Sequence, residues 1–186
     1  SQDLIDKHNI DIIPLTVSFN DVDYKDSIEL NAEAMYNLVD ELDVFPKTSA
    51  ASPGEFEVVF RKYIEQDLDI IYLGVGSKFS ATFQSATLAK TTIGSDRIHL
   101  IDSMNLSSGI ALLLLKAASF IKNGEETLTI VAKLEALVPK VRSQLVIDTL
   151  EYLHKGGRLS TISAFIGKVI RIHPVVHVRN GEMKVS

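Results

Sequence analysis

The stretch DIIYLGVGSKFSAT, residues 69–82, decides the expected fold of this chain. Its first part, residues 69–75, is a compact run rich in β-branched and apolar side chains, which predicts a buried strand. Helical periodicity begins near residue 81 and continues toward residue 94, so a strand, a short loop and a helix follow one another. The loop, residues 77–82, is rich in hydroxyl side chains. A strand that leads into a helix in this way is typical of α/β proteins.

A second hydroxyl-rich segment, KTSAASPGEF at residues 47–56, also precedes a helix. Apolar residues recur at helical spacing through residues 56–64, so this helix has one apolar face. The first turn of a helix offers unpaired backbone N–H groups and the positive end of a dipole. Hydroxyls gathered at two helix starts therefore indicate a pocket for a small anion.

Each of these hydroxyls also has a purely structural interpretation. Ser52 and Glu55, with a proline between them, form the pattern of a capping box, so we predict that Ser52 serves its own helix. Thr48 and Ser49 precede that cap and suit either a ligand or an ordinary loop. Ser80 fits the N-cap of its helix equally well. A ligand site is favoured because two βα-type loops carry surplus hydroxyls, and ligands of open α/β sheets lie at the carboxyl ends of strands.

The composition is that of an ordinary soluble globular protein, with 186 residues of which 46% are hydrophobic and 23% charged. A net charge of -5 with scattered basic residues argues against a nucleic-acid partner. The absence of cysteine excludes disulfides, thiolate metal sites and a cysteine nucleophile, and fits a reducing cytoplasm. The most apolar run, residues 109–118, is interrupted by Lys116 and is too short to span a bilayer, so we expect a buried helix and no stable membrane insertion.

The rest of the chain alternates between strand-like and helix-like periodicity, which indicates an α/β fold. Gly156 and Gly157 interrupt the pattern, and we expect a domain boundary there, with residues 1–157 as one α/β domain and residues 158–186 as the start of a second. A hairpin is expected around the Asn180–Gly181 turn. Strands are expected over residues 10–19, 22–24, 97–102, 144–147, 174–178 and 183–185, and helices over residues 31–42, 108–122, 125–138, 150–154 and 162–170.

Known catalytic and metal motifs fit this sequence poorly. Gly74 and Gly76 resemble the beginning of a dinucleotide fingerprint, but its third glycine would fall on Phe79, whose ring prevents close helix packing. Neither a Gly-x-x-x-x-Gly-Lys-Ser/Thr phosphate loop nor a Gly-x-Ser-x-Gly nucleophile elbow occurs in the sequence. His173 and His177 would share one face of a strand, but no acidic ligand pattern accompanies them, so no metal is expected.

Two arginines are candidate cations for an anionic ligand. Most arginines are solvated or pair with nearby carboxylates, which is the structural alternative for Arg158 and Arg171. Arg158 is the better candidate, because the two glycines before it let the backbone approach a ligand closely. We therefore include Arg158 among the predicted ligand-binding residues.

Five segments of the sequence are compared together, namely residues 10–17, 46–49 with 52–56, 77–86, 101–103, and 148–153 with 156–160. Their order and spacing resemble the DegV family, and the resemblance runs the whole length of the chain. Members of that family are bacterial cytoplasmic fatty-acid-binding proteins with two α/β domains, and several are the lipid-carrying subunit of a fatty acid kinase. The resemblance implies a Rossmann-like N-terminal domain with a parallel sheet, and a second α/β domain only partly present in this chain.

By the same resemblance, Thr48 and Ser80 match the family hydroxyls that hold the fatty acid carboxylate, with Ser49 and Thr82 beside them. The family usually has Ser-Gly-Thr at the second loop, so Ala81 puts a methyl group next to the expected carboxylate. At the first loop the family has Thr-Ser-Gln-Pro-Ser, whose glutamine and proline are both alanine here. The family also begins with a strand ending in Thr-Asp-Ser, of which only the tail near Ser1 is expected in this chain. Its second domain is expected to continue well past Ser186, and a histidine of that further part approaches the head group.

The resemblance implies a carrier protein and not an enzyme. It would bury the tail of a long-chain, palmitate-like fatty acid, use no cofactor, and present the carboxylate to a separate ATP-using fatty acid kinase. One alternative is an α/β enzyme or binding protein for a phosphorylated small metabolite at the same loops, although the sequence shows no general base at a telling spacing. Another is a scaffold or regulatory module whose hydroxyls are all helix caps.

Overall fold

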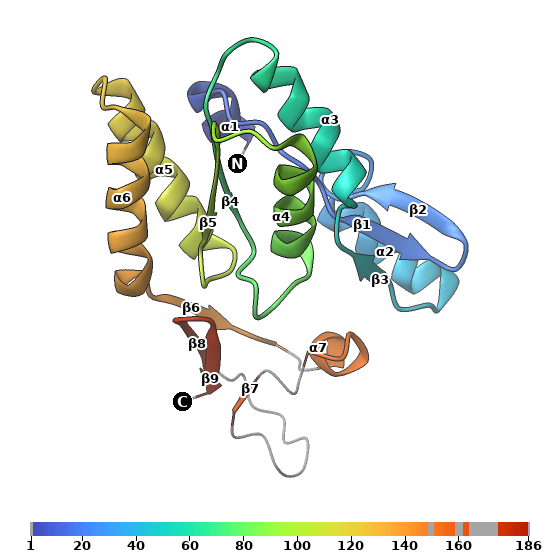
Figure 1. Ribbon diagram of the computed structural model, residues 1–186. Coiled ribbons are helices and arrows are strands. Elements are labelled where there is room, and N and C mark those ends of the chain that lie inside the picture. The colour runs from blue at the N-terminus through green and yellow to red at the C-terminus, as the bar shows by residue number, and fades with distance from the viewer. Residues whose placement is uncertain (1, 149–150, 159–161, 164–174, 186) are drawn as a thin grey trace.

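Two parallel strands, β4 (Ile70–Gly74) and β5 (Ile98–Asp102), lie between two pairs of helices in the computed structural model (Figure 1). The structure describes residues 2–148, 151–158, 162–163 and 175–185. Successive side chains of a strand point to opposite faces of its sheet. Tyr72 accordingly packs with one helix pair and Leu73 with the other.

Helices cover both faces of this parallel sheet. α3 (Pro53–Ile64) and α4 (Thr82–Ile93) pack against each other on one face, and α5 (Ser108–Lys122) and α6 (Thr127–Leu137) cover the other (Figure 1). Burial on both faces explains why β4 is a nearly continuous apolar run. The alternation of parallel strands and helices confirms the predicted Rossmann-like α/β class. The buried core residues of the two layers are Ala51, Phe56, Phe60, Ala86, Ala89 and Ile98, and Leu73, Ile101, Leu113, Ala117, Ile130 and Leu134.

A small antiparallel sheet lies beside α3, in the strand order β2-β1-β3. It consists of β1 (Thr16–Phe19), β2 (Val22–Lys25) and β3 (Lys47–Ser49). The predicted helix α2 (Ala32–Leu42) packs against it and begins at an N-cap asparagine, whose side chain accepts a hydrogen bond of 2.9 Å from the third residue after it. This sheet leads the chain into α3.

The strand predicted over residues 10–19 is shorter than expected. After α1 (Gln2–His8), residues 10–15 are not part of a strand, and β1 begins only at Thr16. Pro14 has no backbone N–H to give to a sheet ladder. The apolar run there is nevertheless used, because Ile13 packs against the core formed by α3 and α4.

A four-stranded sheet forms below the parallel strands in the view of Figure 1, in the order β6-β8-β9-β7. The predicted hairpin is confirmed, since Asn180 and Gly181 have φ values of 52° and 73°, which suit the tight turns that join twisted strands. A short 3-10 turn (Val138–Lys140) leads out of α6, and α7 (Glu151–Lys155) follows β6. The four strands are β6 (Ser143–Val146), β7 (Ile162–Ser163), β8 (Val175–Arg179) and β9 (Glu182–Val185).

The helix predicted over residues 162–170 is wrong at its start. Ile162 and Ser163 form β7, which pairs with β9 in parallel, so a tertiary backbone contact prevails over the local helical spacing. Residues 164–170 of that prediction lie outside the described residues. The boundary predicted between residues 157 and 158 stays a prediction; β6, from before it, pairs with β8, from after it.

Among the described residues, no helix is both long and apolar enough to cross a membrane. The longest helix in the described part of the chain is α5, with 15 residues, and Lys116 lies within it. It packs with α6 against the parallel sheet. The apolar run at residues 109–118 thus belongs to a core helix, as predicted.

Candidate functional site

Thr48 and Ser49 lie in β3, not in the loop that the sequence suggested. β3 pairs antiparallel with β1, with Thr48 opposite Val17 and Ser49 opposite Thr16. Both residues are exposed. Because neighbouring side chains of a strand point to opposite faces, Thr48 and Ser49 project in opposite directions and a single head group meets only one of them in this geometry.

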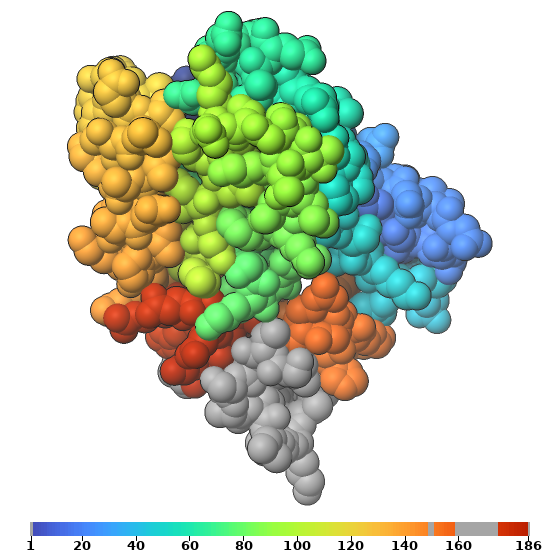
Figure 2. All heavy atoms as spheres, in the orientation of Figure 1, coloured from blue at the N-terminus to red at the C-terminus, as the bar shows by residue number. Residues whose placement is uncertain are grey.

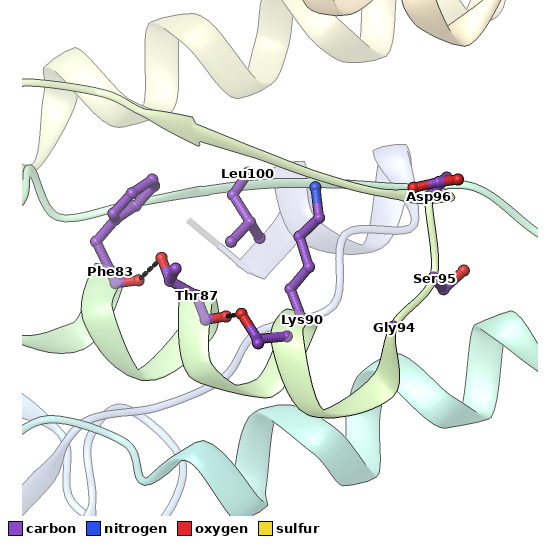
Figure 3. A pocket seen from close by; sticks show the side chains of 8 residues that line it. Phe83, Thr87, Lys90, Gly94, Ser95, Asp96 and Leu100 are labelled. Atoms are coloured by element: carbon purple, nitrogen blue, oxygen red, sulfur yellow. Dashed lines mark hydrogen bonds between the residues drawn. The ribbon is translucent and has the colours of Figure 1, made fainter.

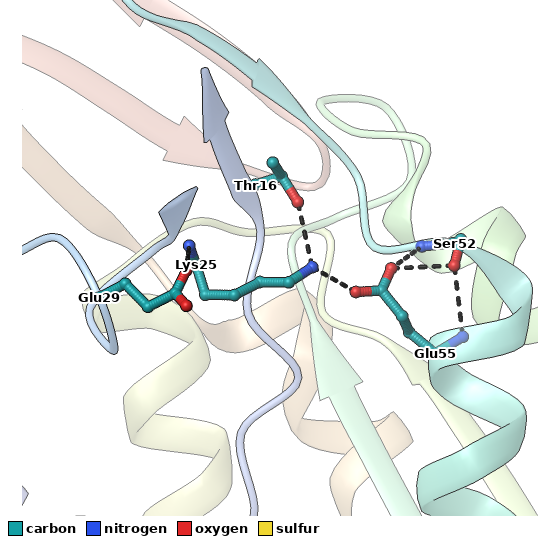
Figure 4. A network of polar contacts seen from close by, with 5 residues as sticks. All are labelled: Thr16, Lys25, Glu29, Ser52 and Glu55. Atoms are coloured by element: carbon teal, nitrogen blue, oxygen red, sulfur yellow. Dashed lines mark hydrogen bonds and ion pairs between the residues drawn. The ribbon is translucent and has the colours of Figure 1, made fainter. Parts of the chain in front are cut away.

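The capping box at the start of α3 is confirmed. The hydroxyl of Ser52 accepts a hydrogen bond from the N–H of Glu55 at 3.3 Å, and the Glu55 carboxylate accepts one from the N–H of Ser52 at 2.7 Å. The other carboxylate oxygen of Glu55 binds the ammonium of Lys25, which also donates to Thr16 Oγ1 at 3.3 Å (Figure 4). These contacts anchor the start of α3 to the antiparallel sheet.

Glu55 is held in its charged form by these contacts. The hydrogen bond from Lys25, followed by the bonds from the backbone and the hydroxyl of Ser52, lowers the pKa of the Glu55 carboxyl to about 2. The carboxylate therefore stays ionised at neutral pH. Its oxygens are engaged in fixing α3, so Ser52 and Glu55 are structural residues, as the sequence predicted.

The second loop holds its two hydroxyls together. Ser80 Oγ lies 2.7 Å from Thr82 Oγ1 and accepts a hydrogen bond of 3.2 Å from the N–H of Thr82. The N-cap position of α4 is Ala81, which has no side-chain cap, so Ser80 caps the helix from one residue further back. Thr82 is buried, whereas Ala81 is exposed and Ser80 half-buried.

The Ser80–Thr82 pair has the chemistry of an anion site. If Thr82 donates its hydroxyl hydrogen to Ser80, the oxygen of Ser80 accepts both bonds and its own O–H is available to an outside acceptor. The pair also lies at the start of α4, where unpaired N–H groups favour negative charge. A carboxylate or phosphate oxygen fits this donor set.

The two helices that follow the hydroxyl-rich segments begin at the same end of their layer. Figure 1 shows the chain entering both α3 and α4 from below. Phe56, in the first turn of α3, belongs to one buried cluster together with Ala51 and with Ala86 of α4. The structure thus brings the two predicted segments to one side of the molecule.

Arg158 follows α7 and contacts the end of that helix. Its Nη1 donates to the carbonyl of Gly156 at 2.7 Å, and its N–H donates to the carbonyl of Leu153 at 2.9 Å. α7 is held by Tyr152, whose ring centroid lies 4.6 Å from that of Phe45, two residues before β3. In Figure 2, α7 (orange) lies below the green loop into α4 and beside the cyan segment that leads into β3.

Tyr72 of β4 packs against two phenylalanine rings. The ring of Tyr72 lies 5.2 Å from Phe56 and 6.5 Å from Phe83, measured between centroids. Burial, with a smaller contribution from the charge of Asp102, raises the pKa of the Tyr72 phenol to about 12. Its hydroxyl bends over Gly74, where an added Cβ would lie 2.0 Å from it. Tyr72 therefore stays neutral and belongs to the aromatic part of the core between β4 and the α3–α4 pair.

A surface depression of about 490 Å³ lies elsewhere on α4 (Figure 3). The side chains of Phe83 and Lys90 extend from the helix on either side of Leu100 of β5. None of the six predicted ligand-binding residues lines it. Its lining residues are Phe83, Thr87, Lys90, Thr91, Gly94, Ser95, Asp96 and Leu100.

The described part of the chain contains no group of three or more His, Asp or Glu side chains that could hold a metal ion. His177 lies on β8, where its Nδ1 is 3.1 Å from the side-chain amide nitrogen of Gln144 on β6. His173, its predicted partner, lies outside the described residues.

Sequence reasoning missed the polar residues at the end of β5. Asp102 accepts hydrogen bonds from the N–H of Ser77 at 3.1 Å and the N–H of Met104 at 3.0 Å, so it joins the loop into α4 to the loop into α5. Ser103 and Asn105 are fully buried beside it. The available signal was a run of polar residues directly after a buried strand, a common place for loop-fixing side chains.

These observations define a class of protein, namely an α/β protein with a hydroxyl-bearing loop at the carboxyl end of a parallel strand. A sequence profile of the DegV family matches residues 1–186. A DegV domain-containing protein of Caldanaerobacter subterraneus is 36% identical over 184 residues, which cover 99% of this chain and 65% of that protein. The chain belongs to the DegV family, and it spans less than two thirds of the length of this relative.

Solved structures share the fold over nearly the whole chain. A stearic acid-binding protein from Eubacterium ventriosum has a TM-score of 0.88 at 27% identity, with 100% of this chain and 66% of that chain covered. DegV from Bacillus subtilis, described as a fatty acid binding protein, has a TM-score of 0.86 at 31% identity, with 98% and 65% covered. This chain therefore has the DegV fold.

Proposed function

We propose that the protein binds a long-chain fatty acid and holds its carboxylate at the loop of Ser80 and Thr82. The observation that carries the proposal is the hydroxyl pair at the start of α4, with oxygens 2.7 Å apart at the carboxyl end of a parallel strand. The fatty-acid-binding relatives in the DegV family support a carboxylate as the anion. Ala81, Arg158 and one of the two β3 hydroxyls, Thr48 or Ser49, are the further residues proposed for the site.

Tail and head group have different tasks in this proposal. A buried methylene contributes about 0.8 kcal/mol, so a sixteen-carbon tail supplies on the order of 10 kcal/mol before the costs of association. The hydrogen bonds at the head group mainly fix its orientation and keep it ionised. A palmitate-like chain suits this balance of affinity and orientation.

The proposed role is to carry the lipid, not to catalyse. The tail is shielded from water while the carboxylate faces a separate ATP-using fatty acid kinase, which performs the phosphoryl transfer. The donors at the site are hydroxyls and backbone N–H groups, which hold an anion but do not act as a general base at neutral pH. A cytoplasmic location belongs to the same proposal.

The test is to express the full-length protein in a bacterial host, purify it, and extract it with organic solvent. Mass spectrometry then identifies the small molecules released. A fatty acid in near-stoichiometric amount supports the carrier role. An extract without lipid, together with a phosphorylated metabolite in the aqueous phase, would replace it by the alternative anion that the same hydroxyls could hold.

A further inference from the structure

A buried polar cluster lies behind the loop that carries Ser80. Ser103, Asn105 and Ser143 are 0%, 1% and 6% exposed. The side-chain oxygen of Asn105 accepts hydrogen bonds from Ser143 Oγ at 2.6 Å and from the N–H of Leu106 at 2.9 Å. Because Ser143 belongs to β6, Asn105 joins the loop after β5 to the C-terminal sheet.

The backbone of Asn105 is linked to Ser80 through one residue. The carbonyl of Asn105 accepts from the N–H of Gly76 at 2.9 Å. The carbonyl of Gly76 in turn accepts from the N–H groups of Phe79 at 2.8 Å and Ser80 at 3.3 Å. Two successive hydrogen bonds therefore separate Asn105 from the residue proposed to hold the carboxylate.

The loops that carry Gly76 and Asn105 are closely packed. A Cβ on Gly76 would lie 2.9 Å from the backbone nitrogen of Asn105, so the two loops touch. Ser103 Oγ donates to the carbonyl of Gly74 at 2.6 Å and accepts from the N–H of Asn105 at 3.2 Å. A displacement of Asn105 is thus transmitted to the loop into α4, because close-packed interiors do not absorb it.

The turn between β8 and β9 contacts the same two loops. The N–H of Gly181 donates to the carbonyl of Met104 at 2.8 Å. A Cβ on Gly181 would lie 2.8 Å from Lys78 Cδ and 3.2 Å from Met104 Sδ. Met104, next to Asn105, and Lys78, two residues before Ser80, therefore both contact the turn at Gly181.

Asparagine is costly at this position if its task is only to fill space. Its Nδ2 is buried without a hydrogen-bond partner among the described residues. An unpaired buried donor carries a desolvation penalty that an apolar side chain of similar size avoids. The compensating gain is the geometry that its Oδ1 imposes on the loop after β5.

We propose that Asn105 is a positioning residue for fatty acid binding. It holds Gly76, and through Gly76 the Ser80–Thr82 pair, in the arrangement that receives the carboxylate. This inference rests on the proposed function, since it assigns the support of the same site. Asn105 acts on the ligand through the loop and not by contact.

The test compares Asn105→Ala with wild type in the full-length protein stripped of lipid. Calorimetric titration with palmitate and with myristate should show affinity lower by about tenfold, the equivalent of one lost hydrogen bond. The factor should be the same for both fatty acids, because only the head group is disturbed. Hydrogen exchange at the Gly76 and Ser80 amides should become faster in the variant, with or without ligand.

Two further variants separate positioning from folding. Asn31→Ala removes the N-cap of α2, where Asn31 Oδ1 accepts from the N–H of Ala34 at 2.9 Å, and should lower stability without changing affinity. Ser143→Ala removes only the bond to Asn105 Oδ1 and replaces the first variant if that one does not fold. It should weaken both fatty acids by one common factor.

The outcomes are distinct. If wild type binds palmitate and the folded Asn105 and Ser143 variants bind it equally well, the positioning role is overturned while the proposed function stands. If Asn31→Ala weakens binding as much as Asn105→Ala, the effect is general destabilisation and the inference also fails. If wild-type protein binds neither fatty acid, the proposed function fails and the inference fails with it.

Discussion

Replacing Ser80 by alanine is the most direct perturbation of the proposed site. The substitution removes the oxygen that lies 2.7 Å from Thr82 Oγ1 and that accepts the N–H of Thr82 at 3.2 Å. It also removes the hydroxyl that would donate to a carboxylate. Stability and affinity should both fall, for different reasons and by different amounts.

The two magnitudes follow from the contacts that are lost. Loss of a capping hydroxyl costs about 1 kcal/mol of the free energy of unfolding. A hydrogen bond to a charged group is worth about 1.5 to 3 kcal/mol, which corresponds to an affinity lower by about ten- to hundredfold. The effect on binding should therefore exceed the effect on folding.

The assay is calorimetric titration of palmitate into lipid-free full-length protein, paired with urea unfolding of the same samples. Ser52→Ala is the matched control, because the Ser52 hydroxyl also accepts a backbone N–H at a helix start and is engaged by Glu55. The control should lose about the same stability as the Ser80 variant and keep its affinity. Equal palmitate affinity in wild type and the Ser80 variant would refute the reasoning, as would an equal loss of affinity in the Ser52 control.

Three further predictions concern the surroundings of the site. The stabilisation from the Glu55 carboxyl, whose pKa lies at about 2 against an ordinary 4.5, is present above pH 4.5 and lost as the pH falls through 2. Unfolding followed by circular dichroism at a series of pH values should show that Glu55→Gln reduces this acid-dependent loss of stability. The same pH dependence in the variant and the wild type would contradict the contact of Glu55 with Lys25. Ultraviolet titration should show one phenol that ionises at about pH 12 and that is absent from the Tyr72→Phe variant. If Tyr72→Phe instead removes a phenol that titrates near pH 10, the burial of Tyr72 is contradicted. Gly181→Ala, at a φ of 73° and with Lys78 Cδ 2.8 Å from the new Cβ, should lower the melting temperature in calorimetry, and an unchanged value would contradict the docking of the hairpin.

Much of the fold was predictable from local sequence. The capping box of Ser52 and Glu55, the helix at Ser108–Lys122 and the turn at Asn180–Gly181 all appear where the residue spacing placed them. Each depends on hydrogen bonds or backbone angles within a few residues, so the local pattern contains the information. The DegV fold was indicated by the resemblance of five longer segments to that family.

The candidate site was predictable only in part. Ser80 and Thr82 lie at the start of α4 as expected, but their hydroxyls bind each other, and Thr48 and Ser49 proved to be strand residues. The sequence indicated which side chains can donate hydrogen bonds. It did not indicate which of those donors another residue already occupies.

The sequence alone determined the α/β class, the starts of α3 and α4, and the presence of hydroxyl side chains beside these two starts. Tertiary structure decided that β3 pairs with β1, about thirty residues away, and that Asn105 meets Ser143 and Gly76 behind the Ser80 loop. Strand pairing and buried polar contacts join residues far apart in the chain. Their partners are selected by packing of the whole core, because a buried donor or acceptor must find its complement wherever the fold brings one.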